Sequence, residues 1–302
     1  MKRPITPMLV CLFCCASLSS VAATEAPPIE LEQALTLRVD GDLTIDPNGV
    51  PTDYAVKTEL PKVLADSLQR QVHAWRFDPI LIDGKPAKVK TLMHVTLGAT
   101  GDGDAMRVSI EAVTFPQKSG AIPDDSRPVS LTSDKPEPPY YPQDELIAGV
   151  EARVAVQLQV GADGKVQQAS VAQTGLLHIK GDPRQLRGAI ADFEHASLKA
   201  ARSWRFKVSA DPEVLERLQV SDPEAYAQAM TVTIPIEFIT TNTPPDQRRG
   251  WQQETRTVKH AAPWLQPDGH AQIVGVNDVA SGEIAMASTQ FHLTTTVVGA
   301  TL

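Results

Sequence analysis

The residues that could carry catalysis or hold a metal ion are few and scattered. Seven histidines are present, at positions 73, 94, 178, 195, 260, 270 and 292. None of them stand at the spacing typical of metal ligands, and carboxylates do not gather beside them in the sequence. All three cysteines, Cys11, Cys14 and Cys15, lie close to the N-terminus. We therefore expect no metal ion and no cofactor.

Motifs for other chemistry are also missing. The segment from Asp102 to Asp104 offers two oxygen ligands of a calcium loop, but Ala105 and Met106 follow where further ligands would be needed. It indicates a hairpin turn instead. No Gly-Xaa-Ser-Xaa-Gly elbow and no phosphate-binding loop occur. The sequence predicts that the protein is not an enzyme; an enzyme or a small-ligand carrier would need a deep pocket between the two halves of the chain.

The N-terminus has the pattern of a cleavable signal peptide. Lys2 and Arg3 precede an apolar stretch from Met8 to Leu18, and small residues end the segment at Ala23. The apolar stretch is shorter than the roughly 20 residues that a spanning helix needs. We therefore expect residues 1–23 to be removed, and the mature protein to be secreted into the periplasm with no cysteine and no stable membrane span.

The charge balance excludes one class of partner. The formal net charge is -8, and losing the two positive charges of Lys2 and Arg3 brings it to -10. Such a chain is repelled by phosphate backbones and by anionic lipid surfaces. We therefore expect no binding to nucleic acid.

One series of features occurs twice: a strand, a tight turn, a second strand, a helix and the triplet Trp-Arg-Phe. The turns are Asn48-Gly49 and Asp163-Gly164, and the triplets begin at Trp75 and Trp204. Counting back along each helix from its tryptophan gives a mostly apolar stripe at helical spacing, Leu64, Leu68 and Val72 in one and Phe193, Ser197 and Ala201 in the other. The repeat predicts an α+β fold of two tandem small domains, each a β-β-α-β unit with an antiparallel sheet and one packed helix.

The expected boundaries follow from this repeat. The first domain spans residues 31–115, including an extra hairpin of residues 88–97 and 106–115, and a Pro-rich linker spans residues 116–138. The second domain spans residues 139–239. Its main helix begins near Asp182 and Pro183, and an insert at 209–230 reads as two short helices, one after Asp211 and one capped by Ser221. A C-terminal extension, residues 240–302, is expected to hold two strands, at 270–276 and 291–298.

The second copy resembles the TonB C-terminal domain family. The resemblance rests on the segment from Pro139 to Pro142, the Asp163-Gly164 turn, the triplet from Trp204 to Phe206 and the closing strand, residues 231–238. The first copy is a divergent relative that lacks the Tyr-Pro segment. The resemblance implies a sheet whose edge strand and Tyr-Pro segment contact a short peptide of an outer-membrane receptor.

A proline inside the closing strand supports this placement. Pro235 cannot donate a hydrogen bond to a central ladder, so the strand should lie at an edge of the sheet. The candidate partner-binding residues are Tyr140, Tyr141, Pro142, Gln143, Thr231, Thr233 and Pro235. Arg76 and Arg205 could bind a partner, but we interpret them as cations that stabilise the C-terminal ends of the two helices.

The sequence thus predicts a periplasmic protein-binding or adaptor module that docks on an envelope protein, such as a TonB-dependent outer-membrane transporter, through β-augmentation. The resemblance also implies what an energy transducer of this family would carry: an N-terminal membrane anchor with a histidine and a long Pro-rich spacer. Here the N-terminal apolar segment contains no histidine and the 24 prolines are scattered, so energy transduction is disfavoured. The alternative is a structural envelope protein that self-associates through its sheet edges as a homodimer, with no role in transport.

Overall fold

The computed structural model describes residues 30–82, 84–101, 106–118, 129–133, 136–240, 250–266 and 271–302. The expected signal peptide and the Asp102–Asp104 turn lie outside the described residues. The helices are α1 (Lys62–Ala74), α2 (Gln143–Ala148), α3 (Pro183–Ala201), α4 (Pro212–Ser221) and α5 (Pro223–Ala229). The strands are β1 (Leu31–Ile45), β2 (Pro51–Val56), β3 (Leu81–Ile82), β4 (Lys85–Pro86), β5 (Val89–Thr100), β6 (Arg107–Thr114), β7 (Gln117–Lys118), β8 (Val129–Ser133), β9 (Glu151–Val160), β10 (Val166–Leu177), β11 (Phe206–Ala210), β12 (Thr231–Phe238), β13 (Gln252–Thr257) and β14 (Glu283–Met286).

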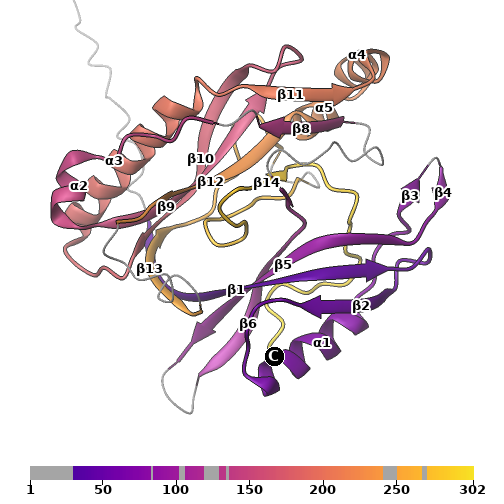
Figure 1. Ribbon diagram of the computed structural model, residues 1–302, viewed down its shortest axis with the longest axis horizontal. Coiled ribbons are helices and arrows are strands. Elements are labelled where there is room, and N and C mark those ends of the chain that lie inside the picture. Colours follow the sequence, from indigo (N-terminus) through magenta and orange to yellow (C-terminus); the bar gives the residue numbers. More distant parts are fainter. Residues whose placement is uncertain are drawn as a thin grey trace, which may run out of the picture.

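Ten of these strands form one sheet, which confirms a mixed α+β fold. Its order is β6-β5-β1-β13-β10-β9-β12-β14-β7, with β2 paired to β1, and the recorded pairings are antiparallel. The sheet continues from one half of the chain to the other, because β13 pairs with β1 on one side and with β10 on the other. Figure 1 shows the two halves as separate parts of the ribbon, joined at one side by this strand.

In the first half, α1 packs beside β2 and shares one apolar core with β1 and β5. The period-2 alternation of β1 places Leu37, Val39 and Leu43 in the core beside Leu68 and Val72 of the helix. The expected helix and the extra hairpin β5–β6 are both confirmed.

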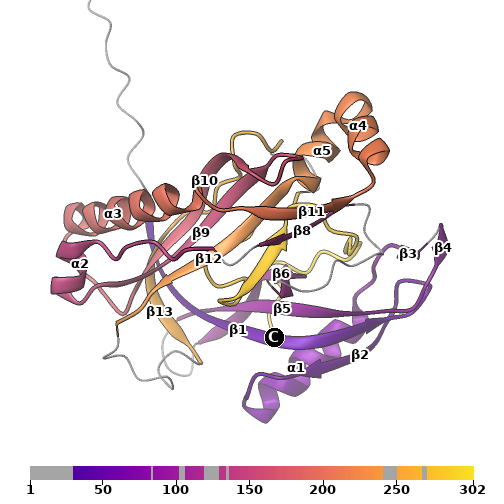
Figure 2. The same ribbon diagram turned by 45° about the horizontal axis from the view of Figure 1, so that its top comes forward.

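In the second half, α3 covers β9, β10 and β12, as Figure 2 shows. It begins at Pro183, where the Asp182 carboxylate accepts hydrogen bonds from two free amides of the first turn, as expected. Trp204 closes the core at the other end of the helix. Its indole Nε1 donates to the carbonyl of Glu137 at 2.8 Å, so the buried ring keeps no unsatisfied polar atom.

The two Gly turns make the same contact with the Trp-Arg-Phe triplets. The amide of Phe77 donates to the Gly49 carbonyl, and the amide of Phe206 donates to the Gly164 carbonyl, each at 2.9 Å. Both glycines have positive φ, +79° and +76°, and a Cβ built on either would lie 2.0 or 2.1 Å from the carbonyl oxygen of that phenylalanine. Glycine is therefore required at both turns for conformation and for space.

The C-terminal extension forms different strands from those expected. Residues 271–276 are not a strand, and residues 291–298 make only an isolated bridge at Leu293; the strands are β13 and β14. The last residues cross to the first half, where the Ile110 amide on β6 donates to the Ala300 carbonyl. Between these ends, the extension passes between the inner faces of the two halves (Figure 1).

The segments flanking the second half are also ordered by the core. Within the expected linker, β8 pairs with β11 and buries Val129 and Leu131. The insert forms the end of β11 and the two short helices, α4 and α5. The cap of α5 differs from the expected Ser221: the side chain of Asp222 accepts the amide of Ala225, because a carboxylate one residue before the helix is in reach of its free amides.

Candidate protein-binding edge

The outer flank of β12 is only partly covered. On its inner flank, β12 pairs with β9 from Thr231 to Phe238. On the outer flank, β14 pairs only with Val232 and Thr233, and the Ala287 amide donates to the Thr231 carbonyl. Beyond this point, residues 234–238 have no strand on that flank in the described part of the chain. The expectation of an edge strand is therefore wrong for the first half of β12, which lies between β9 and β14 because the C-terminal extension adds a strand there; only the second half is open.

The alternation of an antiparallel strand fixes which backbone groups this open edge offers. Because the Thr231 carbonyl points outward to Ala287, the backbone groups of Thr233, Pro235 and Glu237 point outward as well. The missing N–H of Pro235 thus costs the β9 ladder nothing. The open edge presents the Pro235 carbonyl and both the N–H and the carbonyl of Glu237.

A groove of about 330 Å³ runs along this open edge. One wall is β12 from Ile234 to Phe238, and the end is formed by residues 281–284, where the chain enters β14. Residues 136–142, which we call the proline ridge, contribute Pro136, Pro138, Pro139 and Tyr141 to its lining. Most of the lining side chains are apolar, so the groove can take the side chains of an extended peptide paired with β12.

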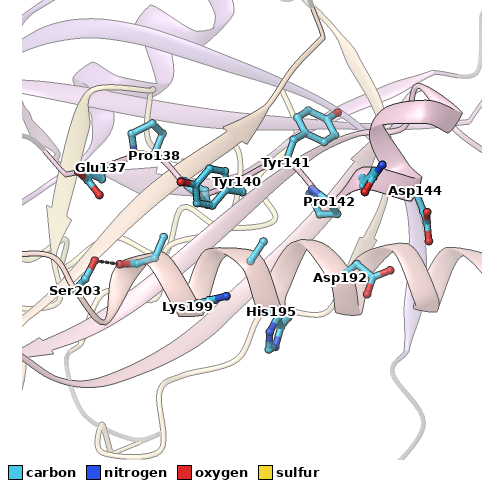
Figure 3. A pocket seen from close by; sticks show the side chains of 14 residues that line it. Glu137, Pro138, Tyr140, Tyr141, Pro142, Asp144, Asp192, His195, Lys199 and Ser203 are labelled. Atoms are coloured by element: carbon cyan, nitrogen blue, oxygen red, sulfur yellow. Dashed lines mark hydrogen bonds between the residues drawn. The ribbon is translucent and has the colours of Figure 1, made fainter.

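The two tyrosines of the proline ridge have different surroundings. Tyr141 is anchored: its hydroxyl donates to the Val150 carbonyl at 2.6 Å, and its ring packs edge-on against Phe193 and Phe238. Burial raises its pKa to about 12, so the hydroxyl keeps its proton. Tyr140 is 94% exposed and points in a different direction from the same ridge (Figure 3).

A second groove, of about 580 Å³, lies between the proline ridge and α3. Pro138, Pro139 and Tyr141 line both grooves, so the ridge separates them. Asp144 and Asp192 lie toward one end, and Lys199 lies toward the other (Figure 3). Pro142 immediately precedes α2 and Gln143 begins it, so both belong to the rim of this groove.

Thr231 and Thr233 are less available than the sequence suggests. Both are fully buried, because β14 and its flanks cover this end of β12. The Thr231 hydroxyl donates to the Ala227 carbonyl and accepts from Trp264 Nε1, so it serves the fold. The structure therefore brings together Tyr140, Tyr141 and Pro235 around the grooves, and separates the two threonines from them.

Exchanging the two tyrosines separately distinguishes anchoring from binding. Tyr141→Phe is expected to lower the free energy of unfolding by about 1 kcal/mol, since a buried carbonyl loses its donor. Tyr140→Ala is expected to leave that free energy unchanged within about 0.5 kcal/mol, because its ring is exposed. Urea unfolding of both variants measures the difference, and equal losses would contradict it.

Arg76 lies at the C-terminal end of α1, as inferred from the sequence, and Arg205 lies just beyond the end of α3. Arg76 Nη1 donates to the carbonyls of His73 and Trp75, and Arg205 Nη1 donates to those of Ser203 and Trp204. The carbonyls bound by Arg76 belong to the last turn and the C-cap of α1, whereas those bound by Arg205 belong to the two residues that follow the C-cap of α3.

Sequence patterns gave no sign of the buried polar layer between the two halves. Asp278 is buried and accepts hydrogen bonds from Thr96 Oγ1, Lys259 Nζ and the Gly275 amide, at 2.6, 2.6 and 2.7 Å. Asn277 donates to Thr36 and Glu254 and accepts from Arg153. These residues join the extension to both half-sheets, and their partners in those half-sheets are too distant in sequence for any spacing to reveal them.

His94 belongs to the same layer. Its ring is buried, with Nε2 lying 3.5 Å from Asp40 and 3.4 Å from Glu283. Burial lowers its pKa to about 4, although Asp40 acts in the opposite direction. At neutral pH the ring is therefore neutral, which fits a structural role.

Glu254 makes stability depend on pH. Burial raises its pKa above the usual value, against the effects of Arg256 and Asn277, and its Oε2 has no hydrogen-bond partner. A raised carboxyl pKa means that stability is lost as pH rises from about 4.5 through the folded-state pKa. Glu254→Gln removes this loss. Between pH 4.5 and the folded-state pKa, its unfolding free energy should therefore rise relative to that of the parent, by about 1.4 kcal/mol for each unit by which folding raises the pKa of Glu254. Urea titrations from pH 4 to 8 measure it; a flat difference would contradict the assignment.

The described residues contain no group of three or more histidine, cysteine or acidic side chains placed to hold a metal ion. Within the same ranges, no helix has the length and apolar character needed to cross a bilayer. Comparison of the chain with family models, with curated proteins and with solved structures finds no match.

Proposed function

We propose that this protein is a periplasmic protein-binding module, and that it takes an extended segment of an envelope protein onto the open half of the β12 edge. The observation that carries this proposal is the unpaired edge of residues 234–238 beside an apolar groove. An incoming strand would hydrogen-bond to Pro235 and Glu237 and place alternate side chains in the groove. A TonB-dependent transporter is the partner class that the resemblance suggests.

The interpretation of the two halves as copies of one domain is part of the same proposal. We interpret the two halves as tandem β-β-α-β copies related to the TonB C-terminal domain. The matched Gly49 and Gly164 turns support this, as do the matched contacts of Arg76 and Arg205. The extension would then be an addition that joins the copies through β13.

Features of the sheet favour a separate partner over self-association. The β6 strand is covered by the C-terminal residues, since the Gly299 and Ile110 backbones are hydrogen-bonded. The open part of β12 is short and holds a proline, a residue that limits pairing between identical edges. The chain is therefore expected to remain monomeric by light scattering, and a stable dimer would favour the structural alternative.

Two variants at one position test the docking edge. Glu237→Pro removes the outward N–H, whereas Glu237→Ala keeps it; both lose the Glu237–Arg153 ion pair. Each folded variant, immobilised, is exposed to solubilised native envelope proteins. We expect the parent and Glu237→Ala to retain the same envelope protein, and Glu237→Pro to lose it at least tenfold. Equal retention by both variants, or none by the parent, would overturn docking at this edge.

A further inference from the structure

A polar cavity of about 620 Å³ lies where the two halves meet. Its walls come from both halves and from the extension: β1 and the segment after β2 on one side, β9 on another, and residues near β13 and Asn277 on the rest. The lining residues are Thr36, Arg38, Asp40, Lys57, Thr58, Glu59, Arg153, Gly250, Gln252 and Asn277. This volume is in the range of small-molecule sites, about 300–1,000 Å³.

The two arginines of this cavity are held in place but keep unused donors. Arg38 donates from Nε to Asp40 and from Nη1 to the Val279 carbonyl. Arg153, which is only 7% exposed, donates from Nε to Glu237 and from Nη1 to Asn277. In the part of the chain that the structure describes, neither Nη2 has a hydrogen-bond partner. A fixed guanidinium with free N–H groups is suited to binding a carboxylate.

The same cavity contains negative charge with spare capacity. Asp40 bonds to Arg38 through Oδ1 and lies near His94, which is neutral at pH 7. Glu59 makes no ion pair with the described residues. Lys57 also lines the cavity, and its Nζ is paired with Asp42, which lies outside the lining. The lining therefore carries three cationic side chains, Arg38, Lys57 and Arg153, and two anionic ones, Asp40 and Glu59. This mixture matches a ligand that carries both charges better than a simple anion.

We propose that this cavity binds a zwitterionic small molecule, of the class of free amino acids and short unblocked peptides. The ligand's carboxylate would bind to Arg38 and Arg153, and its ammonium group to Asp40 and Glu59. This cavity and the groove beside β12 have different linings, but they are linked by the ion pair between Arg153 of the cavity and Glu237 of the groove.

Calorimetric titration with alanyl-alanine, its N-acetylated form and its C-terminal amide tests the charge requirement. The unblocked dipeptide is expected to bind, and each blocked form to bind at least tenfold more weakly. No binding of alanyl-alanine or of free amino acids at millimolar concentration would overturn the proposal, as would equal binding of the blocked forms.

Matched arginine variants test the location. Arg38→Gln should weaken dipeptide binding at least tenfold, whereas Arg70→Gln, on the exposed face of α1, should not change it. Glu59→Gln is a second variant, at the ammonium side, for use if Arg38→Gln does not fold. Unchanged affinity in the folded cavity variants would exclude this cavity as the binding site.

Discussion

Replacing Asp278 with alanine is expected to lower the free energy of unfolding by about 3 kcal/mol, because breaking a buried ion pair leaves its partners unsatisfied. Asp278 holds Lys259, the Thr96 hydroxyl and the Gly275 amide at one point between the halves. This value is at the lower end of the range for breaking a buried ion pair, because the Lys259 side chain is 27% exposed and can reach water. Urea unfolding at pH 7 measures it.

The pH dependence of this stability loss tests whether the ionised Asp278 carboxylate causes it. Burial opposes ionisation of Asp278, but Lys259, Thr96 and Gly275 outweigh it and hold its pKa below 3.8. A lowered carboxyl pKa contributes stability that is present above about pH 4 and is lost as pH falls through the folded-state pKa. The deficit of Asp278→Ala should therefore shrink on acidification. The isosteric control Asp278→Asn, which keeps an acceptor, should lose less at pH 7; a deficit independent of pH would refute the ionic explanation.

Gly49→Ala and Gly164→Ala should each cost about 3 kcal/mol, from a strained positive φ and a broken turn contact. In both turns the new Cβ would meet the backbone carbonyl of the phenylalanine in the triplet, which cannot move without opening the core. Similar losses at the two sites would support the interpretation of the halves as tandem copies.

Gly84→Ala is the matched control for these two substitutions. Gly84 also has positive φ, +73°, but its added Cβ meets no atom within 4 Å. It should cost only the conformational strain, about 1 kcal/mol. Chemical denaturation of all three variants makes the comparison. A loss at Gly84 as large as at Gly164 would show that strain alone, and not the contact with Phe206, sets the cost.

Local signals predicted the elements that carry apolar periodicity or turn chemistry. Asp182 and Pro183 marked the start of α3, and the helical stripe located α1. Pro235 indicated an edge, which holds only for the second half of β12. These signals depend on neighbours in sequence, so they can be read without knowledge of the fold.

The strands of the C-terminal extension could not be predicted in this way. β13 reads Gln-Gln-Glu-Thr-Arg-Thr, with no apolar residue to alternate, yet it lies inside the sheet. Its burial depends on polar partners from distant segments, such as Asn277 for Glu254 and Glu111 for Arg256. The same reason explains why Thr231 and Thr233 were expected at an accessible edge: the residues that cover them come from an extension without a readable pattern.

Amide hydrogen exchange at β12 tests the central claim most directly. In the free protein the Glu237 N–H, which points outward, should exchange quickly, whereas the Ile234 and Ile236 amides, which face β9, should exchange slowly. Addition of the envelope protein retained by the Glu237→Ala variant should slow exchange at Glu237 at least tenfold. If Glu237 is protected in the free protein, or stays fast in the complex, the β12 edge is not the docking site.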